Sequence, residues 1–154
     1  MRTTLRFAVA LAMLGAAEPA HAQRNCTSVE GAFRFTRFEF TGATTAYAEG
    51  SVEGDLAGSF VANYFNISQS GDGVLQLNGS HTITTGGGTL TTLDRIHLQP
   101  DTEAGWFRPN SQLHIVEGRA PYAETTTGLL HTHGRVNPGT LEGSIDWKGR
   151  ICAP

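Results

Sequence analysis

Short runs that alternate apolar with polar residues follow one another along most of the chain, and glycine or proline separates them. Alternation with a period of two is typical of strands that bury one face. After the first 22 residues, the longest stretch without Gly or Pro is Ser59–Ser70, so helices of ordinary length have almost no room. The pattern therefore predicts an all-β protein.

About eight strands are predicted, from nine candidate runs. The candidate runs are Ala32–Phe40, Thr44–Glu49, Leu56–Ser68, Val74–Asn78, Ser80–Thr85, Thr89–Leu98, Gln112–Val116, Gly128–Val136 and Leu141–Ile151. The first run changes phase near Thr36, which indicates a β-bulge or a change of packed face. Pro100–Asn110 is predicted to be the longest irregular segment. Its aromatic residues, Trp106 and Phe107, either cap a core or line the mouth of a cavity.

The last run has the clearest alternation. Its apolar residues Leu141, Ile145, Trp147 and Ile151 share one side, and its charged residues share the other. One face therefore packs on a core and the other meets water. Many antiparallel strands of this kind form a closed barrel or a sandwich, because both architectures protect the sheet edges. We favour a single antiparallel barrel of about eight strands, closed and with a lumen.

The amino terminus resembles a bacterial secretory signal peptide. Arg2 and Arg6 precede the apolar run Phe7–Ala17, and residues 20–22 give the small-x-small pattern that signal peptidases cleave. An apolar run of this length is well short of the roughly 20 residues that span a bilayer, so no membrane insertion is predicted. We expect residues 1–22 to be removed and residues 23–154 to form one exported domain, periplasmic or secreted.

The net charge of the predicted domain indicates which classes of binding partner are excluded. The leader carries two arginines and Glu18, so removing it from 11 basic and 14 acidic residues leaves nine and thirteen, a net charge near −4. Nucleic acids and anionic membrane surfaces are bound by basic faces. The sequence therefore argues against a nucleic-acid partner.

The two cysteines lie at the two ends of the predicted domain. Cys26 comes just after the expected cleavage site and Cys152 lies two residues before the last. In an oxidising compartment such a pair is expected to form one disulfide that joins the termini. A redox or metal pair is the alternative, but the C-x-x-C spacing typical of such sites is absent.

Several glycine-rich segments resemble a known family. They are Gly86-Gly87-Gly88-Thr89-Leu90-Thr91, Leu113-His114-Ile115-Val116-Glu117-Gly118, Tyr122-Ala123, Gly128 and His133-Gly134. They are similar to the glycine pattern of the allene oxide cyclase and dirigent barrels, and the similarity covers roughly Phe60–Gly134. The resemblance implies an eight-stranded antiparallel barrel whose lumen holds a small apolar molecule. It also implies a homo-oligomer, since such barrels commonly form trimers or dimers.

The chain departs from that family at two points. Arg119-Ala120-Pro121 stands where a Gly-Thr-Gly turn is usual. None of the catalytic residues of the plant cyclase matches a position here. The resemblance therefore implies a barrel and a cavity, and it carries no activity over to this chain.

Two of the five histidines beyond the leader have a spacing that suits a metal. His131 and His133 point to the same face of a strand, and such a pair chelates a metal when a neighbouring strand supplies a third ligand. His97, His114 or Glu117 is the candidate third ligand. The alternative is that both histidines lie in water, in the same phase as Arg135. We favour this alternative and predict no metal.

Asp94 is the most unusual polar residue. It shares a phase with Leu90, Ile96 and Leu98, so if that face points inward, Asp94 and Thr92 enter the lumen. A buried carboxylate needs a partner, and such groups often serve as general acids or bases or as ligand anchors. An ion pair with an arginine, or a bulge that turns the side chain outward, is the alternative.

Two aromatic residues are further candidates for lining a cavity. Tyr64 shares a phase with Phe60 and Ala62, and Trp147 lies on the apolar face of the last run. Each supplies a flat apolar wall with one polar group, although such residues more often belong simply to a core. The sequence thus names Tyr64, Thr92, Asp94 and Trp147 as candidate ligand-binding residues.

Three functions are consistent with these observations. The favoured one is an exported barrel that binds a small apolar ligand in its lumen. The second is an isomerase- or cyclase-like enzyme, in which Asp94 and another luminal polar group act on an unsaturated or phenolic substrate. The third is a structural or interaction protein with a filled core. No cofactor is predicted, because the sequence contains neither a phosphate-binding glycine loop nor a nucleophile motif.

Overall fold

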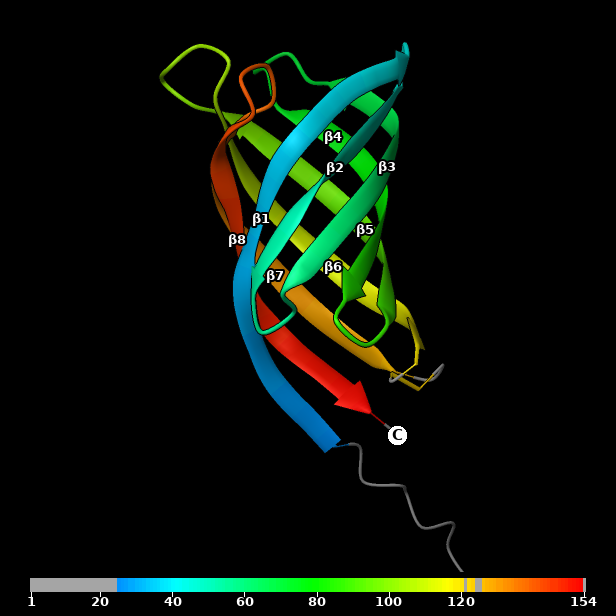
Figure 1. The fold of residues 1–154 in the computed structure, drawn as a ribbon. Coiled ribbons are helices and arrows are strands. Elements are labelled where there is room, and N and C mark those ends of the chain that lie inside the picture. The colour runs from blue at the N-terminus through cyan, green and yellow to red at the C-terminus, as the bar shows by residue number, and fades with distance from the viewer. Residues whose placement is uncertain (1–24, 121, 124–125, 154) are drawn as a thin grey trace, which may run out of the picture.

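A closed barrel of eight strands makes up the described part of the protein, residues 25–120, 122–123 and 126–153 of the computed structural model. The strands are β1 (Asn25–Gly42), β2 (Thr45–Gly54), β3 (Gly58–Gln69), β4 (Leu75–Thr85), β5 (Thr89–Pro100), β6 (Phe107–Arg119), β7 (Thr127–Asn137) and β8 (Glu142–Ala153). Each pairs antiparallel with the next, and β8 pairs with β1 (Figure 1). The predicted fold class is confirmed. The leader predicted at residues 1–22 lies outside the described residues.

Two details of the predicted strands are wrong. Val74–Asn78 and Ser80–Thr85 are parts of one strand, β4, which passes through Gly79 without a break. A Cβ at Gly79 would lie 3.1 Å from a ring carbon of Tyr64, so this glycine marks a close approach inside the sheet and not a turn. The irregular segment predicted at Pro100–Asn110 is also shorter, since residues 107–110 already belong to β6.

A bulge in β1 explains the change of phase near Thr36. The register with β2 shifts between Phe35 and Arg37. Phe33 and Phe35 before the shift, and Phe38 after it, therefore all face the interior despite their odd spacing. The bulge allows the longest strand to bend with the barrel while its aromatic residues stay inside.

The barrel has two different ends. The β1–β2, β3–β4, β5–β6 and β7–β8 connections lie together at one end, which we call the mouth end. The opposite end, the closed end, holds the other connections and the two described chain ends (Figure 1). Its interior is filled by buried apolar side chains: Val52, Leu56, Ile83, Leu90, Ile115 and Leu130.

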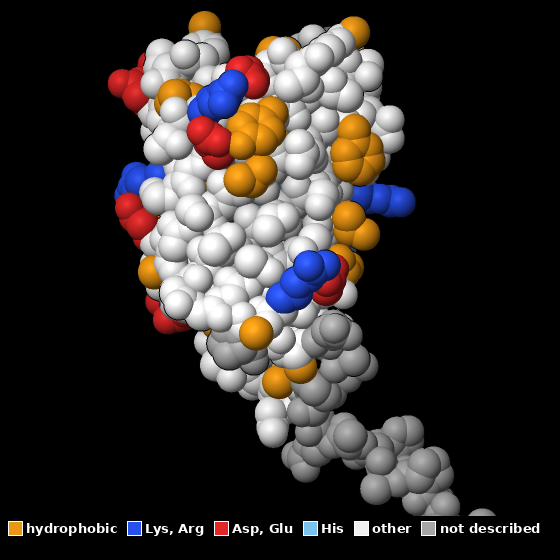
Figure 2. Space-filling model, turned by 45° about the vertical axis from the view of Figure 1, so that its right-hand side comes forward, with side chains coloured by type: hydrophobic (Ala, Val, Ile, Leu, Met, Phe, Trp, Pro, Cys, Tyr) orange, Lys and Arg blue, Asp and Glu red, His pale blue; other side chains and the backbone are white. Residues whose placement is uncertain are grey.

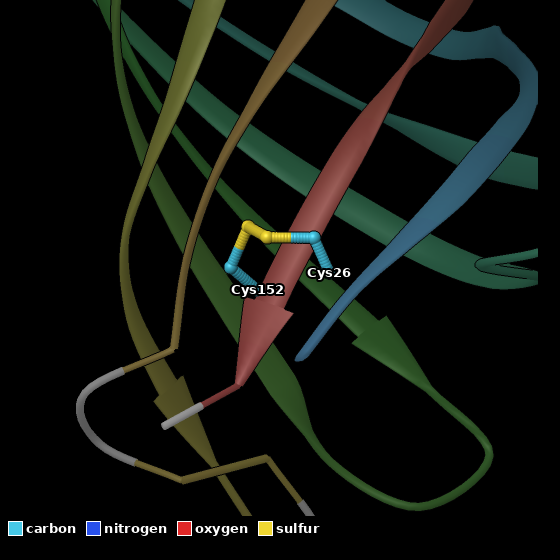
Figure 3. Close-up of a disulfide and its surroundings, with 2 residues drawn as sticks. All are labelled: Cys26 and Cys152. Atoms are coloured by element: carbon cyan, nitrogen blue, oxygen red, sulfur yellow. A yellow bond between two sulfur atoms is a disulfide. The ribbon is translucent and has the colours of Figure 1, made fainter. Parts of the chain in front are cut away.

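A disulfide joins the two described ends of the barrel. Cys26 of β1 lies opposite Cys152 of β8 and the two are bonded (Figure 3), as the sequence predicts. The bond lies on the seam where the last strand meets the first. It indicates a non-reducing, exported environment.

The outer surface carries charges of both signs. On the face drawn in Figure 2, basic and acidic side chains lie close to one another and no basic patch is seen. Arg34 with Glu53, and Arg37 with Glu39, are examples of exposed ion pairs. Within the described residues, no helix is long and apolar enough to cross a membrane.

Candidate binding cavity

The mouth half of the barrel contains an apolar cavity of about 350 Å³. Its size falls at the lower end of the range for small-molecule sites, roughly 300–1,000 Å³. Most of its wall comes from inward-facing aromatic and aliphatic side chains of every strand except β2. They include Phe33, Phe35, Phe38, Phe60, Ile67, Leu75, Leu77, Ile96, Leu98, Phe107, Leu113, Val136 and Ile145.

The cavity begins at the connections of the mouth end and reaches the middle of the strands. Gly105 and Pro138, from two of these connections, line it at the mouth. Phe33, Phe60 and His81 line it near the middle, and the packed closed end lies beyond them. The cavity therefore opens at the mouth end and has an inner end within the barrel.

A cluster around Arg135 fixes the β5–β6 connection beside the mouth. The guanidinium of Arg135 lies 4.1 Å from the centre of the Trp106 ring and pairs with Asp101 and Glu103. Asp101 also accepts a hydrogen bond from Arg108, and this bond holds the pKa of the Asp101 carboxyl well below its usual range. These contacts hold the rim of the cavity in one arrangement.

Three buried side chains at the inner end form a hydrogen-bonded chain. The Tyr64 hydroxyl lies 3.2 Å from Nε2 of His81, and Nδ1 of His81 lies 2.6 Å from Oδ2 of Asp94. Thr92 donates its hydroxyl to the same Asp94 oxygen at 2.9 Å. The chain thus runs from β3 through β4 to β5. Tyr64 and His81 lie on the cavity wall, and Asp94 lies behind them.

The direction of these bonds follows from the donors available. An ionised carboxylate only accepts, so Nδ1 of His81 carries the hydrogen that faces Asp94. In the neutral imidazole, Nε2 is then free to accept the Tyr64 hydroxyl proton. Phe33 stacks on the His81 ring with 5.8 Å between centroids, which fixes the plane of the imidazole.

The environment keeps the Tyr64 hydroxyl protonated. Burial raises the pKa of Tyr64 above its usual value, and the nearby charge of Asp94 raises it further. Tyr64 therefore enters the cavity as a neutral phenol.

A second polar group lines the cavity from β6. Ser111 of β6 is 5 % exposed and lines the cavity. Among the described residues its hydroxyl has no hydrogen-bond partner. Thr132 of β7, by contrast, donates its hydroxyl to the Ser111 carbonyl. A buried hydroxyl without a partner is uncommon in proteins and marks a place where a ligand can bind.

Comparison with known proteins assigns no function to this cavity. No protein-family model matches the chain, and no curated protein or solved structure is significantly similar to it. The resemblance to the allene oxide cyclase and dirigent barrels rests on the glycine segments quoted above and stays a prediction. The function is therefore inferred from the residues of this chain alone.

The structure brings three of the four candidate ligand-binding residues together. Asp94 and Thr92 point into the barrel, as the strand phase predicts, and both are buried. Asp94 is paired with His81, where the sequence had left the partner open. Tyr64 lies on the cavity wall, but Trp147 is packed in the core and is not among the lining residues. Any catalytic role of Asp94 stays a prediction.

Sequence reasoning missed His81 and Ser111, two further polar residues of the cavity. His81 lies in the inward phase of β4, with Leu77, Gly79 and Ile83, and this apolar phase is the signal that could have found it. Ser111 shares the inward phase of β6 with Leu113. Serine is common on both faces of a strand, so the position of Ser111 in the alternation did not distinguish a cavity residue from a surface residue.

The histidine pair considered for a metal faces outward. His131 and His133 of β7 are both exposed. No group of three or more metal-ligating side chains occurs among the residues that the structure describes. Of the three candidate third ligands, His97 and His114 are exposed on the outer face as well, and Glu117 pairs with Arg119.

Proposed function

We propose that the protein binds a small, largely apolar molecule in the cavity of the barrel. The observation that carries this proposal is the cavity itself, which lies in the mouth half of the barrel and is lined almost entirely by apolar side chains. Protein interiors are normally packed as densely as organic crystals. A chain that fills the closed end of its barrel and leaves a cavity at the mouth end is better explained by a ligand than by a structural role.

The polar groups restrict the kind of ligand. Tyr64, His81, Ser111 and Thr132 are polar side chains that an apolar molecule would meet inside the barrel, and Asn137 lines the cavity at the mouth. The ligand therefore has an apolar body and one hydrogen-bonding group, such as a carbonyl or a phenol. Its uptake takes place outside the cytoplasm, in the periplasm or after secretion, which the disulfide supports.

The first prediction tests the cavity with a hydrocarbon. Tetralin, a bicyclic hydrocarbon, is titrated into the protein and binding is followed by saturation-transfer NMR. Leu98→Trp places an indole in the cavity wall on β5. It should weaken tetralin binding about tenfold or more, which corresponds to about 1.4 kcal/mol of lost contact.

The matched control is Leu93→Trp on the same strand. Leu93 is 52 % exposed on the outer face, so this variant should bind tetralin like the wild type. Failure of the wild type to bind tetralin, or equal binding by both variants, would contradict a ligand in the barrel.

A further inference from the structure

We infer that the barrel is also a proton-transfer enzyme, in which Tyr64, His81 and Ser111 enolise a small, largely apolar ketone bound in the cavity. Asp94 acts as a positioning residue behind them. This inference rests on the proposed function, because the ketone must first occupy the cavity. Its basis is the convergence of a hydrogen-bonded chain and an unpartnered hydroxyl on one apolar space.

The chain has the connectivity of an acid–base relay. In such relays a carboxylate orients an imidazole, and the imidazole takes the proton of a hydroxyl. Here Asp94 binds Nδ1 of His81, and Nε2 faces the Tyr64 hydroxyl. Burial keeps the proton on Tyr64 at rest, so its oxygen becomes a strong base once that proton has moved to His81.

The strand register places Ser111 beside this relay. Tyr64, Gly79, Asp94 and Leu113 form one row of paired residues across β3, β4, β5 and β6. Ser111 is the next inward position on β6 toward the mouth. Tyr64, His81 and Ser111 therefore line one cavity, and the Ser111 hydroxyl is free to donate to a carbonyl oxygen there.

The reaction needs no co-reactant. The ketone oxygen accepts a hydrogen bond from Ser111, and the C–H bond beside the carbonyl breaks. Its proton goes to the Tyr64 oxygen while the Tyr64 proton goes to Nε2 of His81. The C–H electron pair forms the C=C bond of the enolate, and the carbonyl π pair moves onto oxygen.

The reverse step completes the turnover without net oxidation or reduction. His81 returns its proton to Tyr64, and Tyr64 delivers one to carbon. Delivery to the same carbon completes hydrogen exchange once the transferred proton has exchanged with solvent, and in a β,γ-unsaturated ketone delivery to the γ carbon gives the conjugated isomer. The substrate class is therefore small cyclic or unsaturated ketones with few other polar atoms, as the apolar wall requires.

The second prediction is tested by hydrogen–deuterium exchange at carbon. The probe is 2-tetralone in D₂O, with loss of its α-proton signals followed by NMR and the buffer rate subtracted. The wild type should accelerate this exchange. Tyr64→Phe should lower the catalysed rate about 100-fold or more. Ser111→Ala should lower it about 100-fold, the effect of removing one donor to a developing oxyanion.

The variants separate catalysis from folding. Ser111→Ala removes a hydroxyl that has no partner in the described structure, so the barrel should stay folded even if Tyr64→Phe does not. Asp94→Asn should lower the exchange rate at saturating 2-tetralone and leave the Kd for 2-tetralone unchanged. A general loosening of the barrel would change both quantities. Tyr47→Phe and Ser59→Ala, which alter residues on the outer face, are the matched controls and should exchange like the wild type.

Tetralin binding distinguishes failure of this inference from failure of the proposed function. If tetralin binds but 2-tetralone exchanges only at the buffer rate, proton transfer is overturned and ligand binding stands. Equal exchange by wild type, Tyr64→Phe and Ser111→Ala overturns it as well. If neither compound binds, both the cavity proposal and this inference fall.

Discussion

At the scale of single residues, the buried phenol of Tyr64 couples the stability of the barrel to alkaline pH. In the unfolded chain a tyrosine ionises near pH 10. In the folded protein, burial and the charge of Asp94 raise the pKa of Tyr64, so the hydroxyl stays neutral to higher pH. The stability associated with the neutral group is therefore complete below about pH 10, and it is lost as pH rises toward the folded pKa.

The third prediction follows from this loss of stability at alkaline pH. The difference in free energy of unfolding between wild type and Tyr64→Phe should change between pH 9 and 11, with the wild type losing about 1.4 kcal/mol more than the variant. Urea unfolding at both pH values measures it. Subtracting the variant removes the contribution of the other tyrosines, and a difference that does not change with pH would show that Tyr64 ionises as freely in the folded protein.

At the scale of the strand, the missing side chain of Gly79 leaves a space on β4 in which residues of the neighbouring strands pack. Tyr64 and Asp94 are its paired neighbours on either side, and His81 is the next inward residue along β4. A Cβ at position 79 would lie 3.0 Å from Ile96 and 3.1 Å from the Tyr64 ring. The absence of a side chain there lets the Tyr64 ring lie over the strand and reach His81.

The fourth prediction concerns this glycine. Gly79→Ala should cost about 1–3 kcal/mol in the free energy of unfolding, the usual effect of overpacking, and should weaken the Tyr64–His81 contact. Gly86→Ala is the control, because a Cβ at Gly86 would have no neighbour within 4 Å. That change should stay within about 0.5 kcal/mol. Urea unfolding and near-ultraviolet circular dichroism of the tyrosines measure both effects, and equal costs would contradict the packing argument.

The same strand shows what could be predicted from the sequence. Alternation alone places Asp94 and Tyr64 inside the barrel, because side-chain direction depends only on position along a strand. The partner of Asp94 depends on how β4 and β5 align, and local sequence does not encode that register. Gly79 separated two predicted runs for a related reason, since the chain alone does not show that a ring from β3 packs over it.

At the scale of the whole molecule, the seam between β1 and β8 is the pairing with the longest sequence separation. It runs from Asn25 opposite Ala153 to Phe33 opposite Ile145. Bringing chain ends so far apart into register costs conformational entropy, which grows with the length of the closed loop. The Cys26–Cys152 bond removes much of that cost by keeping the unfolded chain closed.

The fifth prediction is the effect of opening that bond. The double variant Cys26→Ser, Cys152→Ser should lose about 4–5 kcal/mol of free energy of unfolding, as the chain-entropy model gives for a loop of this size. Urea unfolding measures the loss. Intact mass of the wild type with and without reductant should differ by about two daltons, because reduction adds two hydrogens. An unchanged mass, or an unchanged stability, would contradict the role given to the disulfide.

The position of the disulfide also determines where the protein can be tethered to a support or fused to another domain. Both described ends of the barrel, Asn25 and Ala153, lie beside each other at the closed end, away from the entrance to the cavity. A tether, a fused domain or a solid support joined at either end would leave the entrance facing solvent. The barrel can thus be immobilised from either terminus with its cavity still accessible.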